Sequence, residues 1–191
     1  MTAVDVHAHI FPSSILTEVG DPSAALGVSY SADDKILTFP SGPSRPLFDA
    51  LTDLDGRRAW NRAAGITRQV LSPWMDVAGD DLTGDAARVW TALYNDHVAA
   101  EIDDDDMFLA FATLPIADGV AAASELERAV TQLGFVGGAL PTQAAGINLS
   151  DAGLEELFEA AQSLGVPLFL HPYRVLGADR PCRPRELRLT G

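Results

Sequence analysis

Cysteine and lysine are almost absent from this 191-residue chain, which contains one of each, Cys182 and Lys35. A single cysteine cannot form a disulfide within the chain, so we expect a reducing, cytoplasmic environment. Basic residues as a group are also scarce, because 13 Lys and Arg stand against 27 Asp and Glu and give a net charge of −14. Nucleic-acid phosphates need a basic surface, and this balance therefore argues against a nucleic-acid partner.

Long apolar runs are missing as well. No stretch approaches the roughly 20 residues that span a bilayer, and Met1 leads almost directly into a strand-like segment, so we expect neither a membrane span nor a signal peptide. The chain also lacks repeats and low-complexity tracts. Its length and its 47% of hydrophobic residues are typical of one ordinary globular domain.

Five short apolar runs have the composition of buried β-strands. They lie at residues 3–10, 66–74, 108–116, 135–142 and 167–173. Helical patterns separate the later runs and lie at residues 85–102, 123–133 and 154–164; Ser150 or Asp151 is the expected N-cap of the last, and Gly165 its end. Strands that alternate with helices and read as continuous apolar runs predict a parallel sheet covered by helices.

Two segments do not follow this alternation. About fifty-five residues rich in Pro, Gly, Ser and Asp separate the first two strands, far more than a usual connection. We interpret residues 11–62 as an insertion over the active face, with a small hairpin around residues 36–39. The second segment is the tail, which has no helical or strand period and is crowded with Arg180, Arg183, Arg185 and Arg188.

The opening strand, "VDVHAHIFP", carries two histidines one residue apart. Because alternate residues of a strand point to one face, we expect Asp5, His7 and His9 to share a side, which faces inward in a parallel barrel. Two imidazoles held at the mouth of a barrel suit a divalent cation such as Zn²⁺. The other interpretation is a pair of core histidines, each satisfied by its own backbone partner. Asp5 either orients a ligand histidine or bonds locally at the start of the strand.

His171 ends the fifth strand, in "LFLHPY", and Pro172 stops the strand directly after it. Alone it would be read as a hydrogen-bonded edge histidine, but with two histidines on the first strand it becomes a third metal ligand. His97 falls on the apolar stripe of a helix, near Leu93 and Trp90. We interpret His97 as a packed, hydrogen-bonded histidine outside the site.

Several motifs together resemble the amidohydrolase superfamily, and most closely the branch that contains 2-amino-3-carboxymuconate 6-semialdehyde decarboxylase and related non-oxidative decarboxylases. They are "VDVHAHIFP", "SRPLFDALTD", "VWTALYNDHVAA", "FLAFATLPI" and "LFLHPY". The resemblance runs from about Val4 to Tyr173. It implies a metal-dependent-hydrolase-type (β/α)8 TIM barrel, an α/β fold of about 250 residues, of which this chain has room for only the first five βα units.

The resemblance also implies a site. One Zn²⁺, with Mn²⁺ as the alternative, is bound by His7, His9, His171 and an aspartate of the eighth strand, and a catalytic histidine lies on the sixth strand. Arg45 stands where the decarboxylases have an arginine that binds a substrate carboxylate, although on bare sequence it reads almost equally well as a solvated loop arginine. The resemblance implies a homodimer.

A subtype with one metal ion is favoured by the fourth strand. Two-metal members bridge their ions with a carboxylated lysine there, and "FVGGALPT" contains neither lysine nor a carboxylate.

The chain departs from the family after Tyr173. The sixth-strand histidine and the eighth-strand aspartate have no counterpart, so we identify no catalytic residue and interpret residues 174–191 as truncated or foreign to the fold. The expected function is non-oxidative decarboxylation of a small carboxylated acid of the muconate or benzoate type. The alternatives are hydrolysis of an amide, ester or lactone, and an inactive truncated remnant.

Overall fold

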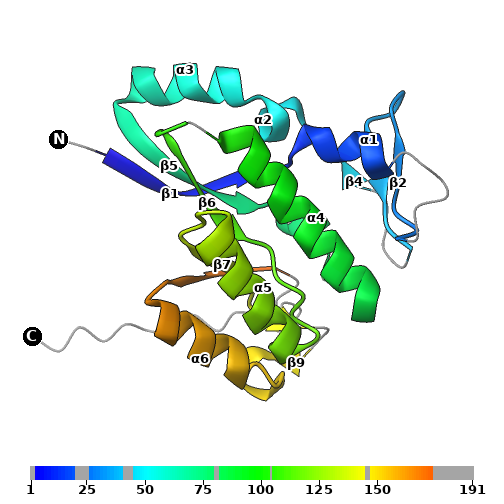
Figure 1. Cartoon of the computed structure of the whole chain (residues 1–191). Coiled ribbons are helices and arrows are strands. Elements are labelled where there is room, and N and C mark those ends of the chain that lie inside the picture. Colours follow the sequence, from blue (N-terminus) through cyan, green and yellow to red (C-terminus); the bar gives the residue numbers. More distant parts are fainter. Residues whose placement is uncertain are drawn as a thin grey trace, which may run out of the picture.

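A five-stranded parallel sheet organises the computed structural model, which describes residues 3–19, 26–40, 45–79, 82–103, 105–144 and 147–173. Its strands are β1 (Ala3–Ile10), β5 (Ile66–Pro73), β6 (Phe108–Ala112), β7 (Gly137–Pro141) and β10 (Leu168–His171). They are ordered β1-β5-β6-β7-β10, and every neighbouring pair is parallel. The sheet curls into half of a barrel, which confirms the predicted fold class (Figure 1). The predicted tail at residues 174–191 lies outside the described residues.

Three helices follow strands of the sheet and cover its outer face. They are α4 (Gly84–Ile102), α5 (Gly119–Gln132) and α6 (Glu155–Leu164), and α5 and α6 lie side by side (Figure 1). The helix α6 ends at Gly165, whose left-handed backbone favours glycine, as expected. Its N-cap is Leu154, whereas Ser150 and Asp151 lie in the preceding 3-10 turn η3 (Leu149–Asp151), so the predicted cap was wrong.

The main core lies between these helices and the sheet. Trp90 and Tyr94 of α4 are fully buried; the Trp90 indole donates to the Val77 carbonyl at 3.0 Å, and the Tyr94 hydroxyl donates to the Ile10 carbonyl. Burial of each such side chain contributes about 1.5–3 kcal/mol. A second cluster is made of strand and turn residues, with no residue from a helix that covers the sheet. Because those helices lie on the outer face, this cluster lies on the opposite, concave face. Its buried members are Val70, Met75, Ala78, Phe111 and Ala139.

Between β1 and β5 the chain forms a small structure of its own. A three-stranded antiparallel sheet joins β2 (Ser29–Ser31), β3 (Ile36–Thr38) and β4 (Arg45–Pro46), and it includes the hairpin expected around residues 36–39. Short helical segments flank it: η1 (Ser13–Ile15), α1 (Leu16–Val19) and α2 (Asp49–Thr52). The segment packs on the main core, since the Phe39 ring lies 5.1 Å from that of Trp90.

A further helix, α3 (Leu54–Ala64), leads into β5 and was not predicted. It starts at Asp53, whose side chain accepts from the Gly56 amide, and ends at a left-handed Gly65. The other short elements are η2 (Met75–Val77) and the two-stranded β8 (Gln143–Ala144) and β9 (Ile147–Asn148). None of the helices described is both long and apolar enough to cross a membrane.

His97 ties α4 to the segment that follows β1. Its Nδ1 lies 2.8 Å from the Ser14 hydroxyl and its Nε2 lies 2.9 Å from the Glu18 carboxylate. Ser14 also donates to Glu101 on the next turn of α4. The geometry agrees with a hydrogen-bonded helix histidine that contributes to packing.

At Gly137 the strand β7 closely approaches Pro167, the residue that precedes β10. A Cβ at this position would lie 2.2 Å from the Pro167 carbonyl oxygen, and Pro167 is also the acceptor for the Gly138 amide. We expect Gly137→Ala to separate β10 from β7 and lower the free energy of unfolding by about 2 kcal/mol or more. Urea unfolding measures this. Gly138→Ala is the matched control, because its Cβ would meet the flexible end of Leu114; equal losses in the two variants would contradict the argument.

Candidate metal centre

The first strand presents two histidines at its carboxyl end through an irregularity in its pairing with β5. Asp5 is opposite Gln69 and Ala8 is opposite Leu71, so three residue steps on β1 match two on β5. Such a bulge reverses which face the residues before it occupy. The His7 and His9 rings both lie on the concave face, whereas the Asp5 carboxylate is directed toward the Gln69 side chain.

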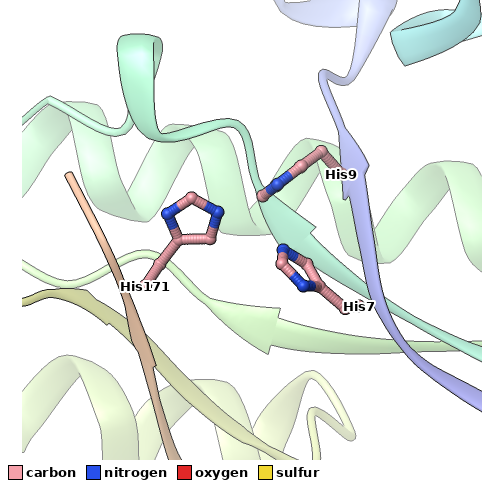
Figure 2. A group of neighbouring side chains, drawn as sticks. All are labelled: His7, His9 and His171. Carbon is pink, nitrogen blue, oxygen red and sulfur yellow. The ribbon is translucent and has the colours of Figure 1, made fainter. Parts of the chain in front are cut away.

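Three imidazoles converge between the first and the last strand of the sheet. The ring centroids are 5.2 Å apart for His7 and His9, 5.2 Å for His7 and His171, and 5.0 Å for His9 and His171. One nitrogen from each ring lies within 4.8 Å of the others. Figure 2 shows the rings directed toward one another from β1 and β10. Among the described residues, no cysteine or carboxylate joins the group.

Backbone carbonyls fix two of the rings. The Nδ1 of His9 lies 3.1 Å from the Pro73 carbonyl, and the Nδ1 of His171 lies 3.1 Å from the Pro172 carbonyl. A carbonyl can only accept, so each Nδ1 carries the hydrogen and each Nε2 keeps its lone pair. This arrangement orients a metal-binding imidazole and leaves the nitrogen that a metal ion would use.

The electrostatics of the site favour the same form of the rings. Burial lowers the pKa of His9, with smaller contributions from His171 and His7, although the bond to Pro73 acts in the opposite direction. Burial, followed by the charge of His7, also lowers the pKa of His171. A lowered pKa keeps an imidazole neutral, and the neutral imidazole is the metal ligand. The donor set therefore fits one divalent cation.

Aromatic rings line the concave face beside the histidines. The Phe169 ring lies 5.1 Å from that of His7 and stacks on Phe111 at 5.7 Å with an interplanar angle of 13°. Both rings belong to the apolar cluster on this face. The three histidines thus lie beside an apolar surface formed in part by stacked aromatic rings.

Asp5 is not on the face predicted by simple alternation. Its carboxylate accepts from the Gln69 side chain at 2.7 Å, and Gln69 also bonds to Asn61 of α3. Asp5 accepts in addition from the backbone amide of His7 at 3.1 Å. The bulge explains the difference, and the carboxylate holds the backbone of a candidate ligand rather than an imidazole ring.

Arg45 lies in β4 with only 12% of its side chain exposed, and its Nε is 3.3 Å from Oδ1 of Asp76. The Tyr173 hydroxyl donates to the same Oδ1 at 3.2 Å. Sequence reasoning missed Asp76 and Tyr173 as neighbours of Arg45. Their place in the sequence could have indicated a role in the site, because both follow the carboxyl ends of parallel strands. Barrel enzymes place functional side chains at these ends.

Comparison with protein families identifies a match to an amidohydrolase model over residues 4–189. Among curated proteins, the decarboxylase orsB of Emericella nidulans is 38% identical over 130 residues, which are 66% of this chain and 38% of that protein. The 2-amino-3-carboxymuconate-6-semialdehyde decarboxylase of Dictyostelium discoideum is 32% identical over 87 residues, 45% of this chain and 24% of that protein. The chain thus matches well under half of each relative.

Solved structures share the fold. A dihydroxybenzoic acid decarboxylase from Polaromonas sp. JS666, solved with manganese and the inhibitor 2-nitroresorcinol, superposes with a TM-score of 0.69 at 26% identity. This match covers 94% of the chain and 52% of that protein. The 5-carboxyvanillate decarboxylase of Sphingomonas paucimobilis gives a TM-score of 0.70 at 18% identity over 96% of this chain and 56% of that protein.

The pKa shifts predict how the stability of the metal-free protein depends on pH. In the unfolded chain the imidazoles of His9 and His171 take up protons below the ordinary pKa of 6.5, whereas in the folded chain their pKa values are lower. Acid therefore favours the unfolded state, and the contribution of these rings, fully present above pH 6.5, is lost as the pH falls through their folded pKa values. We expect the urea midpoint to fall between about pH 7 and about pH 5.

The contribution of His9 is measured by determining the urea midpoint over the same pH range for His9→Gln. We expect the midpoint of this variant to depend less on pH. His97→Gln serves as the comparison outside the trio. A pH dependence that is unchanged in His9→Gln would show that the partly buried His9 ring is not its source.

Proposed function

Because the chain belongs to the amidohydrolase family, we propose that it provides the metal-binding part of a metal-dependent non-oxidative decarboxylase for benzoate-like or muconate-like acids. The observation that carries the proposal is the convergence of His7, His9 and His171 on one point at the carboxyl ends of the strands. The named activities of the relatives support a carboxy-lyase. The chain spans about half of the solved structures, so the activity of the whole enzyme belongs to this proposal.

We propose one divalent cation at the three histidines. Three imidazole ligands suit zinc, while the manganese in the Polaromonas structure favours that ion. When bound, such an ion supplies Lewis acidity toward the oxygens of the substrate. The protein orients the His9 and His171 rings through the Pro73 and Pro172 carbonyls, and burial lowers the pKa of both rings.

The groups around the trio suit an aromatic acid. Phe169 and Phe111 offer an apolar face beside His7 against which a benzoate ring could pack. Arg45 offers a guanidinium for the carboxylate, as expected from its place in the chain. Decarboxylation breaks the bond from the ring carbon to the carboxylate, releases CO₂ and places a proton on that carbon. We assign this proton transfer to none of the described residues.

Metal binding by the purified chain is the first test. We expect about one equivalent of divalent metal by elemental analysis, and a dissociation constant raised more than about 100-fold by His7→Ala, because a lost ligand costs more than a lost supporting bond. His97→Ala is the matched control, since this ring bonds to Ser14 and Glu18 instead. Equal metal content in the parent and in His7→Ala would refute the site, and no metal in either protein would favour the inactive remnant.

Release of CO₂ separates the two catalytic hypotheses. We expect the metal-loaded protein to liberate labelled CO₂ from carboxyl-labelled 2,6-dihydroxybenzoate, and His171→Ala to reduce the rate by at least about 100-fold, because the Lewis acid is lost with its ligand. The same preparations are assayed with a phenyl ester and a lactone. Hydrolysis of these without CO₂ release would instead support the amidohydrolase-type reaction.

A further inference from the structure

Asp76 joins three segments that are far apart in the sequence. It lies in η2, directly after β5, and its Oδ1 contacts both Arg45 of β4 at 3.3 Å and the Tyr173 hydroxyl after β10 at 3.2 Å. Its side chain is 37% exposed, so Asp76 remains partly open to solvent. The arrangement connects the small antiparallel sheet with two strand ends of the half-barrel.

This connection lies close to the histidines. Tyr173 is two residues beyond His171 and packs on the apolar cluster of the concave face, which includes Phe169. The Phe169 ring in turn contacts that of His7. Arg45 and Asp76 are therefore linked through Tyr173 to the wall of the proposed site.

The charge of Arg45 is offset within the protein. Only 12% of the side chain is exposed, and a guanidinium withdrawn from water needs a nearby counter-charge, which Asp76 supplies. A carboxylated ligand that reaches Arg45 consequently meets a guanidinium whose positive charge is partly offset by Asp76. A second carboxylate on the ligand would also be repelled by Asp76.

We propose that Asp76 is a positioning residue that sets the charge specificity of the site. By holding Arg45, it makes the site prefer the benzoate-like acids of the proposed function, with one carboxylate, to muconate-like acids with two. This inference rests on the proposed function only in taking Arg45 as the group that meets the ligand. The preference follows from the pairing of Asp76 with Arg45, and Tyr173 orients the carboxylate that forms the pair.

The test compares benzoate with isophthalate, its analogue with a second carboxylate. Binding of each is measured by calorimetry with and without Mn²⁺, so the readout does not depend on turnover. We expect Asp76→Asn to improve the affinity for isophthalate relative to benzoate by about tenfold, because the removed charge no longer offsets Arg45. Asp76→Glu should restore the preference of the parent.

Two further variants separate charge from structure. Tyr173→Phe removes the hydrogen bond but keeps every charge, so the ratio of the two affinities should stay within about twofold of that of the parent. Arg45→Gln combined with Asp76→Asn should abolish the tenfold change, because the two residues act as one unit. Circular dichroism melts establish that each variant is folded.

An affinity ratio unchanged in a folded Asp76→Asn protein would overturn the inference, as would equal changes in Asp76→Asn and Tyr173→Phe. Absence of binding of either acid to both the parent and Asp76→Asn would overturn it too, since Arg45 would then not meet carboxylates. Failure of CO₂ release alone would count against the proposed function and leave these binding ratios interpretable.

Discussion

One irregularity in the pairing of β1 with β5 determines what the opening strand can do. The extra residue between Asp5 and Ala8 places His7 and His9 on the concave face and leaves Asp5 with Gln69. With regular alternation, a carboxylate would share the face of the imidazoles and would raise their proton affinity. The bulge thus keeps acidic charge away from rings that must remain neutral.

The curvature of the sheet is the second requirement. β1 and β10 are the first and last strands in the sheet order, yet their histidines meet at ring separations of 5.0–5.2 Å. A flat sheet would hold these strands about four strand spacings apart, or roughly 19 Å. The site therefore exists only because the sheet curls, and close approaches such as that of Gly137 to Pro167 are part of its geometry.

The sequence predicted what depends on local period and missed what depends on contacts between distant segments. The parallel strands, the three later helices and the convergence of the three histidines followed from apolar runs, helical spacing and strand-end position. The face of Asp5 could not be predicted, because a one-residue bulge leaves no mark on the pattern of alternation. The helix α3 was missed because it contacts the sheet through polar groups: Asn61 and Arg57 bond to Gln69, and Arg57 also bonds to the His9 carbonyl.

The place of the histidines in the sheet has a mechanical consequence. Two come from one edge strand and the third from the opposite edge strand, with no backbone hydrogen bond between those strands in the described sheet order. An ion bound by all three would form a cross-link over the open side of the curl, and its ligand bonds would resist any motion that flattens the sheet. Any structure that packs against the edges β1 and β10 would in turn set the distances between the three histidines. Metal binding and the curvature of the sheet are therefore thermodynamically linked.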